Sequence, residues 1–201
     1  MMEKKWLDLY LQEMWYVKKR IDAIRYIATH KQTTLFQFTN IEFMTLQIRK
    51  IIEHIAMGNL VANKELYEEY STKFSSNWNA KYIFRDLERL NPKFYPIPVK
   101  TVDTNIKEIK EWITINDDFL SKEDAIKIYD KCGALMHVSN PYGSQTDPHY
   151  YERMMPIWYK KIMNLLSQHL IHMVGGDQIY CIVMNGEKNP QGYQFVRDDE
   201  M

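Results

Sequence analysis

The chain has 201 residues, of which 45% are hydrophobic, enough for one large domain with an extensive core. Its 26 basic residues balance 26 acidic residues, so no net charge attracts nucleic acid or an anionic membrane, and RNA or DNA binding would require a local basic patch. The two cysteines, Cys132 and Cys181, have no Cys-x-x-Cys spacing, so neither a disulfide framework nor a zinc site is predicted.

We expect neither a secretory signal nor a membrane span. The first residues include lysines at positions 4 and 5, but no apolar segment followed by small residues, which argues against a secretory signal. No apolar run approaches the roughly 20 residues that a membrane span needs. Since free cysteines are typical of a reducing compartment, we expect a cytoplasmic protein without membrane contact.

Two long helices are predicted in the N-terminal third. From residue 4 to about residue 29, apolar side chains recur at three- and four-residue steps, which is typical of an amphipathic helix with a basic opposite face that includes Arg20. A second helix, capped by Thr39 or Asn40, extends to about Leu60 and is apolar on nearly every side. This pattern is typical of a central helix, so its charged residues require partners or a cleft. Those residues are Glu42, Arg49, Lys50, Glu53 and His54.

Further helices are predicted at about 63–74, 78–90, 121–137 and 147–173. Ser75-Ser76-Asn77, Ser121 and Asp147 are their predicted N-caps, and Pro156 either kinks the last helix or marks a second start. Asn91-Pro92 ends the helix at 78–90, and three prolines make residues 91–100 an extended strap. The segment 106–115 fits either a helix or a strand.

A β-hairpin is predicted at residues 177–197. The runs 178–184 and 192–196 are rich in β-forming residues and flank a loop that contains Asn185-Gly186. Because an isolated hairpin is marginal in water, it must lie against the helices. The predicted fold is therefore mainly α, a helical bundle with a small C-terminal β-hairpin packed on it. We expect a single domain over residues 1–201, with a helical body at 4–174.

Several kinds of chemistry lack their usual motifs. The chain contains no Gly-x-Gly-x-x-Gly, Walker A, Gly-x-Ser-x-Gly or His-Glu-x-x-His sequence, so nucleotide-driven chemistry, hydrolase triads and zinc proteolysis are not supported. His169 and His172 have the i, i+3 spacing of metal ligands on a helix, but a metal site needs a third and a fourth ligand. We predict no metal and no cofactor.

The motif with the most chemical content is Arg49-Lys50-Ile51-Ile52-Glu53-His54, inside the second predicted helix. It resembles the Arg-x(4 to 6)-His motif of the HEPN superfamily, small all-helical proteins that include metal-independent ribonucleases of toxin and antiviral systems. The resemblance covers this motif and the helical architecture. It implies Arg49 and His54 as catalytic residues, RNA as the substrate, and a homodimer in which two copies of the motif share a cleft.

The chemistry of such a site is simple. An imidazole moves the proton of a ribose 2′-hydroxyl or of the leaving oxygen, while a guanidinium holds the phosphate, and no metal is required. Five residues along a helix correspond to roughly 140° of rotation, so Arg49 and His54 would not share a face, which fits a dimeric site. The alternative is structural, with Arg49 and Glu53 as an i, i+4 pair and His54 as a hydrogen-bonded core residue.

A second segment, residues 129–141, also resembles the HEPN pattern. The motif His of that superfamily commonly closes a helix before a polar turn, and His137 has this placement, with Lys131 near the position expected for the Arg. We predict His137 as a third catalytic residue, and Lys50, Lys131 and Asn140 as substrate-binding residues. In the alternative, His137 only closes its helix, where a cation interacts favourably with the helix dipole.

A basic stripe is the predicted substrate surface. Lys81, Arg85 and Arg89 follow one another at i, i+4, beside Trp78 and Tyr82, a combination that can hold phosphates and stack a base. Acidic residues at 86 and 88 leave open an ordinary solvated face.

Two functions follow. The first is a HEPN-like metal-independent endoribonuclease or RNA-binding protein, of a toxin or phage-defence system, acting as a homodimer. The alternative is a non-catalytic helical protein that regulates or binds a protein partner through aromatic- and Met-rich surfaces.

Overall fold

The computed structural model describes residues 2–30, 36–63, 79–105, 110–138, 142–143, 146–173, 178–184 and 188–196. Its helices are α1 (Met2–Thr29), α2 (Gln37–Ala62), α4 (Ala80–Leu90), α5 (Lys122–Leu135) and α6 (Pro148–Leu166). The predicted helix at 63–74 lies almost wholly outside the described residues. Asn140, the cap at 75–77 and Trp78 lie outside them as well.

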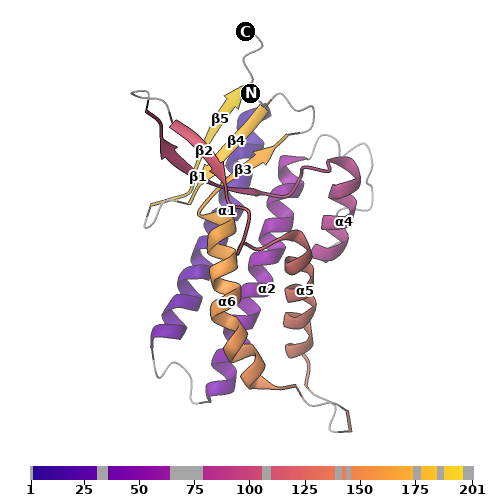
Figure 1. Ribbon diagram of the computed structural model, residues 1–201. Coiled ribbons are helices and arrows are strands. Elements are labelled where there is room, and N and C mark those ends of the chain that lie inside the picture. Colours follow the sequence, from indigo (N-terminus) through magenta and orange to yellow (C-terminus); the bar gives the residue numbers. More distant parts are fainter. Residues whose placement is uncertain are drawn as a thin grey trace.

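The helix α2 is central, as its composition predicts. It contacts each of the other four described helices, and Figure 1 shows it lying among them. Ile48, Ile51, Ile52 and Ile55 share one face at the i, i+3, i+4, i+7 spacing and are at most 1% exposed. Gln47 and Ala56 are buried on either side of this stripe, because helices cover α2 on more than one side. The helix begins at Gln37, earlier than predicted, since the hydroxyl of Thr39 donates to the carbonyl of Phe36 instead of capping the helix.

Side-chain caps begin the later helices. The Ser121 hydroxyl accepts a hydrogen bond from the Asp124 amide at 3.1 Å, and the Asp147 carboxylate accepts one from the His149 amide at 2.9 Å. Both caps confirm the prediction, while Asn79 caps α4. Pro156 lies inside α6 without ending it. None of the described helices combines the length and the apolar character that crossing a membrane requires.

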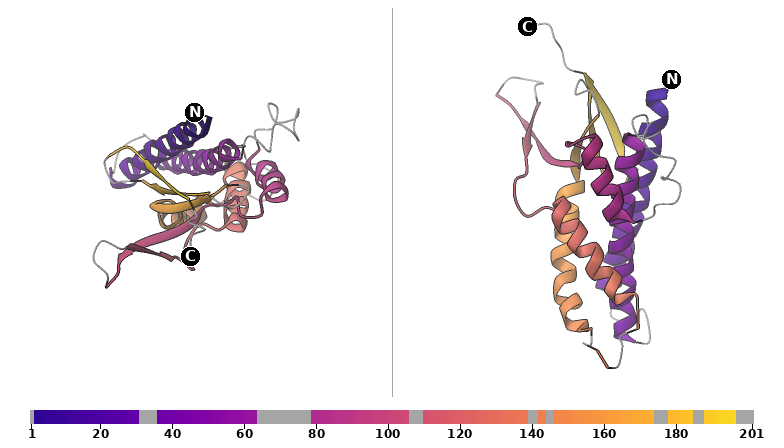
Figure 2. Two further views of the ribbon diagram at one scale, coloured as in Figure 1. Left: turned by 90° about the horizontal axis from the view of Figure 1, so that it is seen from above. Right: turned by 90° about the vertical axis from the view of Figure 1, so that its right-hand side faces the viewer.

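The β-structure is larger than the predicted hairpin. Five antiparallel strands form one sheet in the order β2-β1-β3-β4-β5. They are β1 (Ile97–Asp103), β2 (Lys110–Thr114), β3 (Gln168–His172), β4 (Gln178–Val183) and β5 (Gln191–Val196). The pairing of β4 with β5 confirms the hairpin, the strap continues into β1, and the ambiguous segment 106–115 contains β2. Figures 1 and 2 show the strands gathered at one end of the helical bundle.

The predicted helix at 147–173 was wrong over its last seven residues, 167–173, which is about two turns. The helix α6 ends at Leu166, and β3 follows after one residue. A short apolar run fits a buried strand as well as a buried helix, so periodicity could not decide. Strand pairing decides it, since β3 lies between β1 and β4 and hydrogen-bonds to both.

The sheet has two apolar faces. Ile171, Tyr180 and Ile182 belong to the main core against the helices, whereas Leu170 and Cys181 face a smaller cluster with Val99. This alternation follows from the period of two along a strand. On the outer face the Trp112 ring of β2 contacts the Phe195 ring of β5, with 4.6 Å between centroids. These strands are the two edges of the sheet, so the sheet curls over the smaller cluster.

A buried hydrogen bond joins the first helix to the sheet. The Tyr10 hydroxyl, on α1, donates to Nε2 of His169 at 2.9 Å, and Nδ1 of His169 donates to the Leu166 carbonyl at 3.1 Å. Both side chains are fully buried. Burial lowers the pKa of His169 from 6.5 to about 4, so the imidazole is neutral in the folded chain at neutral pH.

His169 therefore makes the protein sensitive to acid. Below pH 6.5 the unfolded chain takes up a proton on His169 that the folded chain does not bind until the pH approaches 4. Between pH 7 and pH 5 this difference should remove about 2 kcal/mol from the free energy of unfolding. Urea denaturation of the wild type and of His169→Gln at both pH values measures it. A wild type that loses no more stability than the variant would contradict the prediction.

Candidate functional site

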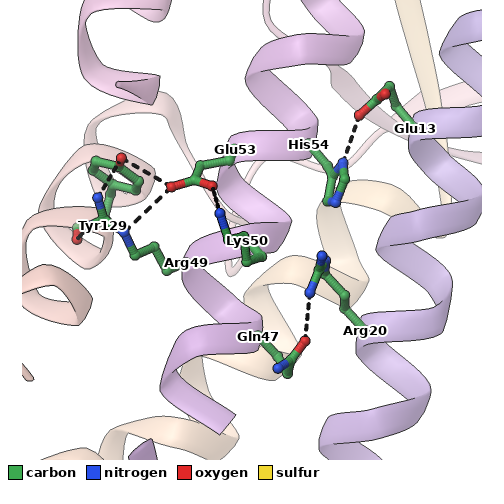
Figure 3. Close-up of polar contacts among 8 residues, drawn as sticks. All are labelled: Glu13, Arg20, Gln47, Arg49, Lys50, Glu53, His54 and Tyr129. Carbon is green, nitrogen blue, oxygen red and sulfur yellow. Dashed lines mark hydrogen bonds and ion pairs between the residues drawn. The ribbon is translucent and has the colours of Figure 1, made fainter. Parts of the chain in front are cut away.

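Arg49 joins α2 to α5. Its guanidinium lies over the Tyr129 ring, with 3.7 Å between Cζ and the centroid, and donates to the Tyr129 hydroxyl at 2.6 Å and to the Tyr129 carbonyl at 3.1 Å. Its Nε is 3.4 Å from Oε1 of Glu53, and Lys50 is 2.7 Å from the other carboxylate oxygen. These four residues, Arg49, Lys50, Glu53 and Tyr129, form the Arg49 cluster (Figure 3).

Gly133 makes room for the Arg49 cluster. A Cβ atom at this position would lie 2.9 Å from Nη1 of Arg49. Glycine inside a helix costs roughly 1 kcal/mol relative to alanine, so this close approach is a physical reason for glycine in α5. The donors of Arg49 thus point to α5 and to Glu53, and its side chain is only 24% exposed. In this arrangement Arg49 connects two helices.

His54 faces the opposite neighbour, α1. Its Nδ1 is 2.6 Å from Oε2 of Glu13, and its ring stacks on Tyr16 with 5.3 Å between centroids and an interplanar angle of 11°. The His54 and Glu13 side chains are 19% and 24% exposed. The structure therefore does not bring Arg49 and His54 together within one chain, as the rotation of roughly 140° between them predicts.

Arg20 of α1 points toward His54. Its Nη1 donates to Oε1 of Gln47 at 2.8 Å, and its Nε is buried without a hydrogen-bond partner in the described part of the chain. Figure 3 shows the guanidinium and the imidazole directed toward one another between α1 and α2. We call Glu13, Tyr16, Arg20, Gln47 and His54 the α1–α2 polar cluster.

The α1–α2 polar cluster has the parts of an acid–base site. A carboxylate at Nδ1 orients the imidazole and leaves Nε2 to exchange a proton with a ligand. A neighbouring guanidinium can hold a phosphate. Sequence reasoning placed Arg20 only on a basic helix face and missed Glu13. The signal was their spacing, because residues seven apart lie on the same face of a helix.

His137 lies apart from these contacts. It follows the C-cap residue Met136 of α5 and is exposed, and no hydrogen bond or ion pair joins it to Arg49 or His54 in the described residues. Lys131 lies over the Tyr150 ring, with Nζ 5.5 Å from the centroid.

The basic stripe is exposed and partly paired. Lys81 is 3.1 Å from Asp130, and Arg85 is 3.1 Å from Asp86 and lies over the Tyr82 ring at 5.1 Å. Arg89, also exposed, is on the last turn of α4. Tyr82 is 44% exposed, so the face keeps an aromatic surface beside two cations. These exposed ion pairs contribute little to stability.

The described part of the chain contains neither a cluster of metal ligands nor an activated thiol. No group of three His, Cys, Asp or Glu side chains there is arranged to hold a metal ion. His169 and His172 lie on a strand instead of a helix, so an i, i+3 spacing places them on opposite faces. Burial raises the pKa of Cys132 to about 12, which keeps it a neutral thiol.

An open pocket of about 430 Å³ lies elsewhere, between the Pro-rich segment, the end of β2 and the start of α5. Apolar groups of Phe94, Tyr95 and Phe119 line it, as do Lys122 and Glu88, which are paired with each other. None of its lining residues belongs to the Arg49 cluster or to the α1–α2 polar cluster.

Comparisons with protein-family models, with curated proteins and with solved structures find no match to this chain.

The contact between Arg49 and Gly133 predicts a strong energetic coupling. Gly133→Ala should lower the free energy of unfolding by roughly 1 to 2 kcal/mol in the wild type, because Nη1 must leave the Tyr129 carbonyl. In an Arg49→Met background the same change should raise it by about 1 kcal/mol, the ordinary gain of alanine in a helix. Denaturant unfolding of the four proteins measures the coupling. Equal effects in both backgrounds would contradict it.

Proposed function

We propose that this chain is a HEPN-like, metal-independent endoribonuclease whose acid–base group is His54. Glu13 orients the imidazole, and Arg20 holds the scissile phosphate. The observation that carries the proposal is the Glu13–His54 pair, 2.6 Å apart and partly accessible, with the Arg20 guanidinium directed toward it. The HEPN-like character rests on the Arg49-to-His54 motif and the mainly helical fold.

The reaction needs only groups of this kind. Nε2 of His54 accepts the proton of a ribose 2′-hydroxyl while that oxygen attacks phosphorus, and the bond from phosphorus to the 5′-oxygen breaks. The leaving oxygen takes a proton from an imidazolium, which in the two-fold dimer implied by the resemblance is that of the second copy. The products are a 2′,3′-cyclic phosphate and a 5′-hydroxyl. Arg20 stabilises the charge that develops on the phosphoryl oxygens.

The proposal moves the phosphate-binding role from Arg49 to Arg20. The Arg49 guanidinium already donates twice to Tyr129 and lies beside Glu53, so binding a phosphate would require it to leave these partners. Arg20 keeps a buried Nε without a partner in the described residues and makes one hydrogen bond to a neutral amide. Catalytic roles for Arg49 and His137 remain predictions that the same assay tests.

One observation favours the non-catalytic alternative. Tyr193 and Phe195 on the outer face of β5 are 49% and 46% exposed, although large apolar side chains are usually covered. The Phe195 ring contacts the Trp112 ring, so the outer sheet face presents several aromatic rings. Exposed apolar surface of this kind is typical of contacts with other proteins. If the purified protein does not cleave RNA, the non-catalytic protein-binding function is the better supported of the two.

The test is cleavage of single-stranded RNA by the purified protein in EDTA. His54→Ala should reduce the rate by about 10²- to 10⁴-fold, the usual contribution of a positioned acid–base group. Arg20→Gln should reduce it by roughly 10²-fold or more, because it removes charge stabilisation at the phosphate. Arg49→Met should lower thermal stability and leave the rate of the remaining folded protein nearly unchanged.

A matched control is available on α6. His149 and Glu152 form another His–carboxylate pair, 3.3 Å apart, but the His149 side chain is 78% exposed and lies in neither cluster. His149→Ala should leave cleavage unchanged, as should His137→Ala if that residue only follows the end of α5. Cleavage that survives His54→Ala, or that His137→Ala removes, would overturn the assignment.

A further inference from the structure

Two neighbouring aromatic residues of α1 are exposed at the α1–α2 polar cluster, namely Tyr16, which belongs to the cluster, and Trp15 beside it. Trp15 and Tyr16 form an edge-to-face pair with 5.2 Å between centroids and are 38% and 39% exposed. Tyr16 in turn stacks on His54 at 5.3 Å. The rings of Trp15, Tyr16 and His54 therefore form a continuous row that leads from the proposed acid–base group to solvent.

Cations flank this row. Nζ of Lys19 lies 5.3 Å from the centroid of the Trp15 ring, one helical turn further along α1. Arg20, next to Lys19 in sequence, points toward His54 (Figure 3). A phosphodiester chain offers the complementary pattern, since each nucleotide has an apolar base face and an anionic phosphate. Lys19 and Arg20 thus place positive charge beside the aromatic row of Trp15, Tyr16 and His54.

We propose that Trp15 is the stacking platform for an unpaired base next to the scissile phosphate, and that Lys19 binds the phosphate on the far side of that base. The inference rests on the proposed ribonuclease function, because it assigns the substrate class to the same site. The ligand is a single strand, since the bases of a duplex are stacked on one another and their faces cannot reach a protein side chain.

The experiment measures binding without cleavage. The probe is a fluorescein-labelled, unstructured 2′-O-methyl oligoadenylate, which lacks the 2′-hydroxyl nucleophile, and the readout is the Kd from fluorescence anisotropy. Trp15→Ala should weaken binding about tenfold, within the range of one lost base stack. Trp15→Phe should recover much of this loss, and Lys19→Gln should lower the dependence of the Kd on salt by about one phosphate contact.

Tyr26→Ala is the matched control. Tyr26 is also an exposed aromatic residue on α1, at 58% exposure, but it lies in the last turn of the helix and stacks on His30. Its replacement should leave the Kd unchanged. Equal weakening by Trp15→Ala and Tyr26→Ala would overturn the inference, as would binding of a base-paired duplex as tightly as the single strand or no binding of the probe.

Cleavage assays separate the two proposals. If the wild type cleaves RNA and Trp15→Ala neither slows cleavage nor weakens binding, the stacking site is wrong and the ribonuclease stands. If Trp15→Ala weakens binding selectively but the wild type does not cleave, the binding site stands and the catalytic assignment of His54 fails.

Discussion

The structure depends on how one buried helix satisfies its charged side chains. Four of the described helices contact α2, so an ionic group that faces one of them must find a partner within reach or an access route to water. Arg49 and Glu53 meet that requirement on the side of α5, and His54 meets it on the side of α1. The helix is held to both neighbours by these polar contacts in addition to its isoleucine side chains.

The two polar clusters differ in what they leave available. In the Arg49 cluster two cations, a carboxylate and a phenol satisfy one another. Burial, followed by the charge of Glu53, raises the pKa of Tyr129 and keeps it a hydrogen-bond donor. In the α1–α2 polar cluster the His54 ring is held at Nδ1, and Nε of Arg20 has no hydrogen-bond partner among the described residues. A structural role suits the first arrangement, whereas a ligand could complete the second.

The sheet holds the end of the bundle at which α1 begins and α2 ends (Figure 1). Trp6 of α1 meets Tyr180 of β4 edge to face at 4.5 Å, and the buried bond between Tyr10 and His169 follows one turn along α1. Both contacts come from the face of α1 opposite to Trp15 and Lys19. One face of α1 therefore anchors the sheet while another remains in solvent.

Local sequence determined much of the helical architecture. Periodicity placed α1 and α2 and made α2 central, and side-chain caps placed α5 and α6, because these signals act within a few residues. Local signals left helix and strand open at β2 and wrongly predicted a helix at β3, because pairing with distant strands supplies the energy there. The local signals identified His54 as a candidate site residue but missed Glu13. They placed Arg20 on a basic helix face without showing that it lies near His54. Glu13 lies 41 residues from His54, and only the packing of α1 on α2 brings their side chains together.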